Sequence, residues 1–172
     1  NGDYYGGGIF IMESSPSIDH CIISDNHVEG GGGAIACLAA DPRFDFCVIY
    51  MNSAELSGGA VLCDWASRTE FWNCTITDNQ TENQGGGVFV RRGSRILIIS
   101  SILWQNSPQE ILISDEGSIA HITFSTIMNG LDSIEVEDGG RVIWRNAAIS
   151  DNPLFIDPDN GDYRISWASF PI

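Results

Sequence analysis

The stretch that decides the fold is GGGIFIMESSPSIDHCIISDN, residues 6–26, because the chain repeats it. Each clear copy opens on a glycine run and closes on an asparagine. Further copies run over residues 32–52, 58–79 and 85–106, and two degenerate copies close at Gly130 and Asn152. The steps between closing positions are 26, 27, 27, 24 and 22 residues. A unit this short cannot bury its apolar side alone, so we expect the copies to stack on one another.

The copies can be aligned position by position. Each reads as an apolar residue, two residues, cysteine, one residue, isoleucine, two residues and asparagine. The aligned sets are Ile18-Cys21-Ile23-Asn26, Phe44-Cys47-Ile49-Asn52, Phe71-Cys74-Ile76-Asn79, Ile98-Ser101-Leu103-Asn106, Ile122-Ser125-Ile127-Gly130 and Trp144-Ala147-Ile149-Asn152. The strand after each glycine run keeps one phase, with the pairs Ile9/Ile11, Ile35/Cys37, Val61/Cys63, Val88/Val90, Ile111/Ile113 and Ile134/Val136.

This pattern predicts an all-β fold, a right-handed parallel β-helix of about six rungs of roughly 22–27 residues. Each copy holds two or three short β-rich pieces in which apolar and polar residues alternate. Such strands are too short for a self-standing sheet, but they can pair in parallel with the turns above and below. The 172 residues fit one domain, with rungs over 6–152 and a closing segment over 153–172. Because the chain starts on a repeat without methionine, we expect a fragment of a longer secreted chain.

Three residue types have structural roles in this interpretation. The glycines allow a sharp bend through positive φ. Asparagine tolerates the left-handed turn, and stacked asparagine side chains can hydrogen-bond along the column. The expected ladder is Asn26, Asn52, Asn79, Asn106 and Asn152. Cys21, Cys47 and Cys74 share one row of the repeat. Because stacked strands lie about 4.8 Å apart, a disulfide between neighbouring cysteines of this row is geometrically possible. Buried free thiols are the favoured interpretation.

The charge limits the range of partners. The chain has 23 acidic residues and 8 basic ones, all arginine, for a formal charge of −15. That field repels phosphate backbones and anionic membrane surfaces, so no nucleic-acid partner is expected. No apolar run approaches the roughly 20 residues of a membrane span, so no membrane insertion is expected in this segment. An acidic exterior is typical of a soluble secreted protein and is compatible with divalent cations.

The glycine-strand motif and the Cys-x-Ile-x-x-Asn closure resemble the repeat of secreted bacterial right-handed β-helix proteins, and are similar to those of polymorphic outer membrane proteins. The end of the chain, Asn152-Pro153-Leu154-Phe155-Ile156-Asp157-Pro158 followed by Asn160-Gly161-Asp162-Tyr163, resembles the C-terminal segment of large surface β-helix proteins. The resemblance implies secretion and an extracellular or cell-surface location. It implies no single activity, because the family mixes structural, adhesive and carbohydrate-active members.

Catalytic chemistry has weak support in the sequence. A polysaccharide lyase needs a base, usually lysine or arginine, and the chain has no lysine. Its one basic cluster is Arg91, Arg92 and Arg95, for which a solvated strand end is the favoured interpretation. A hydrolase needs two carboxylates at a fixed separation. The nearest approach to such a pair is Asp115 and Glu116, one rung from Glu135, Glu137 and Asp138, and these residues could instead form an acidic patch that binds a cation.

Two weaker binding hypotheses remain open. Trp72 and Trp104 fall on out-of-phase positions, where they could stack on sugar rings beside the arginine cluster. Asp157, Asp159 and Asp162 resemble half of a calcium loop, but Ala168 stands where the closing glutamate would be. Calcium is therefore the one cofactor considered, and a turn held by aspartate side chains is favoured over it.

The sequence thus predicts a non-catalytic extracellular structural or adhesive β-helix module. Unpaired strand edges at the ends of a column would let copies stack end to end into fibres. The alternative is a carbohydrate-active β-helix, either an enzyme on acidic polysaccharide or a sugar-binding module. The expected partner is accordingly a second copy of the chain or a surface polysaccharide.

Overall fold

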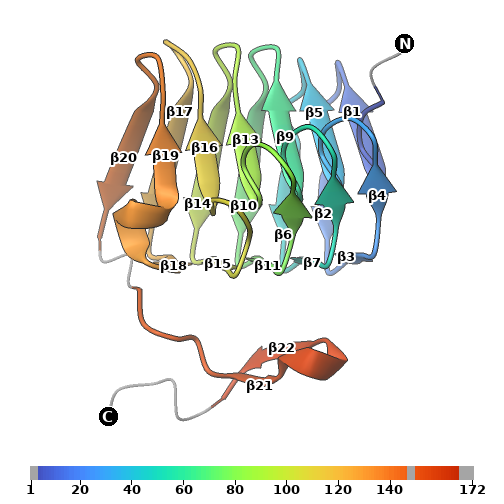
Figure 1. Ribbon diagram of the computed structural model, residues 1–172, viewed down its shortest axis with the longest axis vertical. Coiled ribbons are helices and arrows are strands. Elements are labelled where there is room, and N and C mark those ends of the chain that lie inside the picture. Colours follow the sequence, from blue (N-terminus) through green and yellow to red (C-terminus); the bar gives the residue numbers. More distant parts are fainter. Residues whose placement is uncertain (1–3, 147–149, 167–172) are drawn as a thin grey trace.

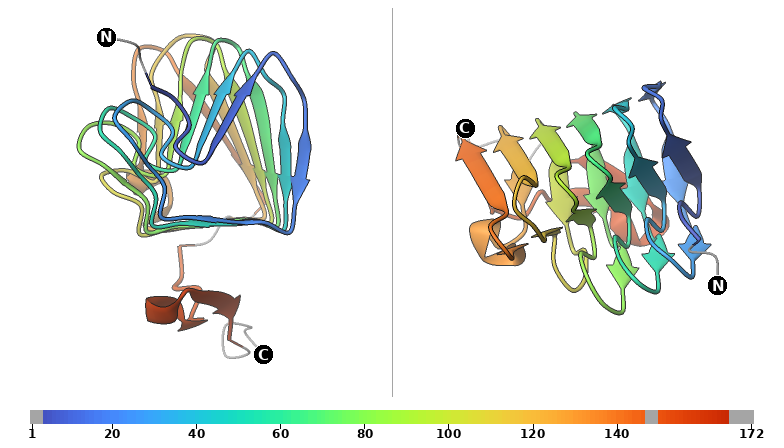
Figure 2. Two further views of the ribbon diagram at one scale, coloured as in Figure 1. Left: turned by 90° about the vertical axis from the view of Figure 1, so that its right-hand side faces the viewer. Right: turned by 90° about the horizontal axis from the view of Figure 1, so that it is seen from above.

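A computed structural model describes residues 4–146 and 150–166, and its strands coil into a column. Figure 1 shows the turns side by side along the column, from the first turn at one end to the last at the other. Seen end on in Figure 2, successive turns nearly superpose. The predicted all-β, right-handed parallel β-helix is confirmed.

Three parallel sheets form the sides of the column. The first holds β1 Ile9–Met12, β5 Ile35–Leu38, β9 Val61–Asp64, β13 Val88–Val90, β16 Ile111–Ile113 and β19 Ile134–Val136. The second holds β2 Ser17–Asp19, β6 Arg43–Asp45, β10 Arg68–Trp72, β14 Arg95–Ile99, β17 Ile119–Thr123 and β20 Arg141–Arg145. The third holds β3 Ile22–Ser24, β7 Val48–Tyr50, β11 Thr75–Thr77, β15 Ile102–Trp104 and β18 Thr126–Ile127.

The structure differs from the prediction in two details of the turns. A fourth parallel sheet is made of two-residue strands, namely β4 His27–Val28, β8 Ser53–Ala54 and β12 Gln80–Thr81. Among the described residues five turns reach the third sheet, and a sixth contributes only β19 and β20, so the column is slightly shorter than six rungs.

The predicted register is confirmed. In the second sheet, one row runs Ile18, Phe44, Phe71, Ile98, Ile122 and Trp144. These side chains point inward, and Phe44 and Phe71 stack with ring centroids 4.9 Å apart. Since side chains alternate across a strand, an inward row fixes the outward rows beside it. The outer surface can therefore be assigned residue by residue.

The glycine runs fold back over the outer side of the first sheet. Gly32 has φ +75°, so the predicted positive-φ bend is present. A Cβ on Gly33 would lie 2.1 Å from the carbonyl oxygen of Gly59 on the next turn, so only glycine fits. The loops cover a second apolar cluster made of Ala36, Leu62, Phe89 and Leu112.

The chain's end does not continue the column. After the last turn it passes below the solenoid, where β21 Phe155–Asp157 pairs antiparallel with β22 Asp162–Ile165 around the short 3-10 turn η2 Pro158–Asn160. A second 3-10 turn, η1 Gly130–Ser133, lies in the fifth copy. Tyr163 anchors the hairpin, since its ring centroid lies 4.9 Å from that of Tyr50 on β7. The described part of the predicted closing segment, residues 153–166, therefore lies along one side of the column.

Candidate functional site

The asparagine ladder is present over four turns. The side-chain Nδ2 of Asn52 donates to Oδ1 of Asn79 at 2.9 Å, and Asn79 donates in the same way to Asn106. Backbone N–H groups of the same residues donate to the same oxygens, so each step holds two bonds. The left-handed corner lies one residue earlier than we expected, for example at Asp78 with φ 54°. The ladder residues themselves thus serve hydrogen bonding and not the bend.

Glu110 ends the ladder, which sequence reasoning missed. Its carboxylate accepts from the backbone N–H of Asn106 at 3.1 Å and from its Nδ2 at 2.5 Å. Only 2% of the residue is exposed, and burial raises the pKa of Glu110 to about 7, against the opposing effect of the two bonds from Asn106. A buried carboxylate thus replaces the fifth asparagine.

Asn152 is not part of the ladder, which corrects the prediction. It is exposed, and its Oδ1 accepts from the backbone N–H of Leu154 two residues further on. The reason is that the chain leaves the column after β20, so no turn places Asn152 above Asn106. Ala147 and Ile149, predicted for the same copy, lie outside the described residues.

The cysteine row is buried except at its first member. Cys47 and Cys74 are each 1% exposed, whereas Cys21 on the first turn is exposed, which corrects the expectation for that residue. All five thiols are free in the structure. The row continues as Ser101, whose hydroxyl accepts from the backbone N–H of Cys74 at 3.0 Å. These residues are therefore part of the interior framework.

Arg91 and Arg92 are held by a buried carboxylate. Asp64 is fully buried and its Oδ2 lies 2.8 Å from a terminal nitrogen of Arg91 and 3.0 Å from one of Arg92. The Arg92 guanidinium also lies over the ring of Trp65, 5.7 Å from its centroid. Because Asp64 offsets one of the two guanidinium charges and holds both side chains, these arginines are less available to an anion than unpaired ones.

The other predicted ligand residues are not gathered around that pair. Arg95 projects from the outer side of the second sheet on β14. Trp72, on β10 of the same sheet, donates its Nε1–H to Glu70 and has one ring face covered by Arg43 at 4.5 Å. Trp104 is partly exposed on β15 of the third sheet. The predicted sugar platform of tryptophans and arginines therefore does not exist as one site.

The three aspartates proposed for calcium also point to different partners. Asp157 accepts from the Nδ2 of Asn160, and Asp162 forms a pair with Arg164 that lowers the pKa of Asp162. Asp159 faces the column instead. In residues 4–146 and 150–166 no group of three or more His, Cys, Asp or Glu side chains is placed to hold a metal ion. Calcium binding here stays a prediction.

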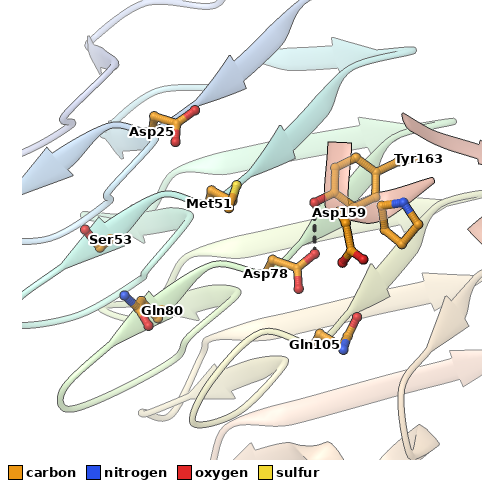
Figure 3. A pocket seen from close by; sticks show the side chains of 9 residues that line it. Asp25, Met51, Ser53, Asp78, Gln80, Gln105, Asp159 and Tyr163 are labelled. Carbon is orange, nitrogen blue, oxygen red and sulfur yellow. Dashed lines mark hydrogen bonds between the residues drawn. The ribbon is translucent and has the colours of Figure 1, made fainter. Parts of the chain in front are cut away.

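A polar groove lies where the C-terminal hairpin meets the column (Figure 3). Its volume is about 600 Å³, and it runs across the corner between the third and fourth sheets. It is lined by Asp25, Met51, Ser53, Asp78, Gln80, Gln105, Pro158, Asp159 and Tyr163. The lining from the column is periodic, because Ser53 and Gln80 are register partners, and Asp25, Met51, Asp78 and Gln105 each precede an asparagine of the ladder.

Tyr163 and Asp78 join the hairpin to the groove floor. The Tyr163 hydroxyl donates to Oδ2 of Asp78 at 3.0 Å, and the hydroxyl of Thr77 donates to the same oxygen at 2.9 Å. Burial, and then the charge of Asp78, raise the pKa of Tyr163 above its usual range, so the phenol stays protonated as a donor. The hairpin is therefore hydrogen-bonded to the column on this side of the groove.

A second hollow of about 300 Å³ extends the groove along the fourth sheet. It shares Ser53 and Gln80 with the first and adds Glu55 and Glu82. The combined surface offers amides, hydroxyls and carboxylates, without a basic residue other than His27 among the lining residues. Sequence reasoning missed this groove because half of it comes from a hairpin that no periodicity connects to the column.

The fold and this outer groove define the class of protein: a solenoid whose repeats present side chains in axial rows. The chain belongs to the right-handed β-helix family, whose model, described as "Right handed beta helix region", matches residues 3–119 and again 55–169. No curated protein matches the chain. No solved structure matches it either. Among the described residues no helix is long and apolar enough to span a membrane.

Proposed function

We propose that this chain is a non-catalytic adhesive module that works outside the cell or on its surface and holds a polysaccharide in the groove of Figure 3. The observation that carries the proposal is the periodic lining. Gln80 and Ser53 occupy equivalent positions one turn, about 4.8 Å, apart, beside the row that contains Asp78 and Gln105. A lining that repeats along an axis suits a polymer that repeats along its length, and amide, hydroxyl and carboxylate groups are suitable partners for sugar hydroxyls.

The charge of the groove favours a neutral sugar chain. Asp25, Asp78 and Asp159 line it, and Glu55 and Glu82 border its extension. These carboxylates would repel a uronate or a sulfate, whereas neutral hydroxyls can donate to them. The volume lies within the range of about 300–1,000 Å³ that small-molecule sites occupy. Extracellular placement and kinship with polymorphic outer membrane proteins are part of the proposal. The resemblance of the glycine-strand and Cys-x-Ile-x-x-Asn repeat supports the kinship, and the resemblance of residues 152–163 to the end of large surface β-helix proteins supports the placement.

Hydrolysis of the same polysaccharide is the second candidate. Asp25 and Asp78 stand two turns apart in one row, which places their Cα atoms about 9.6 Å from each other. That is close to the upper end of the roughly 6.5–9.5 Å between the carboxyl groups of inverting glycosidases. Binding is favoured over hydrolysis because Asp78 is already occupied by the hydroxyls of Tyr163 and Thr77.

The test is affinity electrophoresis of the intact chain in gels that contain dextran, xylan or galactomannan. We expect at least one of them to retard the chain. Gln80→Ala should weaken that retardation about threefold or more, because it removes an exposed amide from the groove lining. The matched control is Gln84→Ala, which removes an exposed amide outside the groove. Equal losses in both variants, or no retardation in any gel, would overturn the proposal.

A further inference from the structure

The outer side of the second sheet collects most of the arginines of an acidic protein. Five of the 8 arginines project from it: Arg43, Arg68, Arg95, Arg141 and Arg145. We call this surface the arginine face. Strands β6, β10, β14, β17 and β20 lie next to one another along the column in Figure 1, so the face is continuous.

The arginines stand in register with one another. Arg68 on β10 is the partner of Arg95 on β14, Arg95 is the partner of Ile119 on β17, and Ile119 is the partner of Arg141 on β20. At about 4.8 Å per turn, this row places guanidinium groups one turn apart and then two turns apart. A hollow of about 210 Å³ lies between Arg68, Arg95, Leu97 and His121, and Glu70, which accepts a hydrogen bond from Trp72, also lines it.

The spaces between the arginines are polar on β6 and β10, where Asp45 and Glu70 lie, and largely apolar from β14 onward. Beyond Glu70 its row continues as Leu97, His121 and Ile143, and beyond Trp72 the next row continues as Ile99 and Thr123. These side chains are half-buried, so they form a shallow apolar floor. From β14 to β20 the surface thus offers charge and contact area to a ligand whose anionic groups are separated by uncharged ring faces.

Most of this positive charge has no partner within the molecule. In the part of the chain that the structure describes, no carboxylate lies within 4.0 Å of the side-chain nitrogens of Arg68, Arg95, Arg141 or Arg145. The four arginines that do form ion pairs are Arg43 with Asp45, Arg91 and Arg92 with Asp64, and Arg164 with Asp162. A chain with 23 acidic residues thus leaves its unpaired arginines on one face.

His121 lies beside Arg68 and Arg95 on the arginine face. Its pKa is lowered first by burial and then by the charges of Arg145, Arg95 and Arg141. A neutral imidazole is what a locally positive potential favours. Three arginines of the face therefore lie close enough to act on His121, although the chain as a whole carries a charge of −15.

We propose that the arginine face binds an acidic polysaccharide, with uronate carboxylates paired to Arg68, Arg95 and Arg141 and the sugar rings lying on the apolar floor. The spacing of the arginines argues against nucleic acid. Duplex DNA carries one charge per roughly 1.7 Å, far denser than these guanidinium groups, and the acidic remainder of the chain would repel it. Single-stranded nucleic acid is bound largely by stacking of its bases on aromatic side chains. In the described strands β2, β6, β10, β14 and β17, the one tryptophan of this face is Trp72, and Arg43 covers one face of its ring. This site is separate from the groove, so its test does not depend on the proposed function.

The test measures binding of the intact chain to immobilised polygalacturonate in low and high salt, with dextran and single-stranded DNA as comparison ligands. We expect binding to polygalacturonate that weakens as salt rises. Arg95→Gln should weaken it about tenfold, since one charge-assisted pair is lost, and lower the slope of log K against log salt by about 1. Arg164→Gln is the matched control, because Arg164 is exposed and lies on β22; less than a twofold change is expected.

Three results would overturn the inference. They are equal losses in Arg95→Gln and Arg164→Gln, no binding to polygalacturonate at low salt, and equally tight binding to single-stranded DNA. If Arg95→Gln lowers the melting temperature, Arg141→Gln on the outermost strand β20 gives the same readout, and its failure to weaken binding would also overturn the inference.

Discussion

The asparagine ladder allows a quantitative prediction about stability. Asn79 is fully buried, and its Oδ1 accepts from both the backbone N–H and the Nδ2 of Asn52. Its own Nδ2 donates to the carbonyls of Ile49 and Thr77 and to Asn106. Asn79→Ala removes all of these and leaves the buried N–H of Asn52 without an acceptor.

The expected loss follows from those contacts. A buried donor without an acceptor costs about 1–3 kcal/mol, and each of the other lost hydrogen bonds costs up to about 1 kcal/mol. We therefore expect Asn79→Ala to lower the free energy of unfolding by about 3–5 kcal/mol. A typical domain has about 5–15 kcal/mol in total, so the loss should be plain.

The assay is urea unfolding followed by circular dichroism. The control is Asn83→Ala, because Asn83 is exposed and its side chain donates to the carbonyl of Glu55 outside the ladder. The control should lose less than about 1 kcal/mol. A loss in Asn79→Ala no greater than in the control would refute the reasoning that the ladder stabilises the column.

Three further predictions test other parts of the molecule. Burial raises the pKa of Glu110 to about 7, so protonated Glu110 stabilises the fold below the unfolded pKa of about 4.5, and this stabilisation is lost as pH rises to about 7. Between these two pH values the free energy of unfolding of wild type, measured in urea melts, should fall by about 3 kcal/mol more than that of Glu110→Gln. Asp64→Asn should destabilise the fold by about 1–3 kcal/mol in thermal melts, since Arg91 loses its buried partner, and an unchanged melting temperature would contradict this. Tyr163→Phe removes the bond to Asp78 and should speed proteolysis of the C-terminal hairpin while the column stays intact; equal cleavage rates would show that the bond does not hold the hairpin.

The repeat made the column predictable. Short strands that alternate outward and inward, such as Arg43–Asp45 with Phe44 inward, allow one register only, because a slip by one residue would turn the apolar set outward. The same register held through the degenerate fifth copy, where Ile122 pairs with Trp144. The fourth sheet was not predictable in this way, since each of its strands has two residues and no apolar alternation.

The functional surfaces were harder to predict for different reasons. The arginine face had a signal in the sequence, since Arg68 and Arg95 occupy the same outward position of successive copies, but the compact cluster Arg91 and Arg92 looked more basic. Asp64 lies in an earlier turn, and only the fold shows that it pairs with both arginines of that cluster. The groove depends on Tyr163, which reaches the column through a contact that no repeat encodes.

End-to-end assembly stays a prediction of the sequence. Among the described residues β1 and β19 are the outer strands of the first sheet, and β21 and β22 pair only with each other. Electron microscopy of the purified chain with and without millimolar calcium tests it. Filaments would support stacking, and discrete monomers under both conditions would refute it.

The most direct test of the proposed function measures binding and product together. The intact chain is incubated with each neutral polysaccharide that retards it, and the reducing ends released are counted over a day beside an Asp78→Asn variant. If the groove binds polysaccharide without cleaving it, wild type should be retained on the polysaccharide, and neither protein should release reducing ends. Release by wild type that Asp78→Asn abolishes would contradict it and would establish the groove as a hydrolytic site.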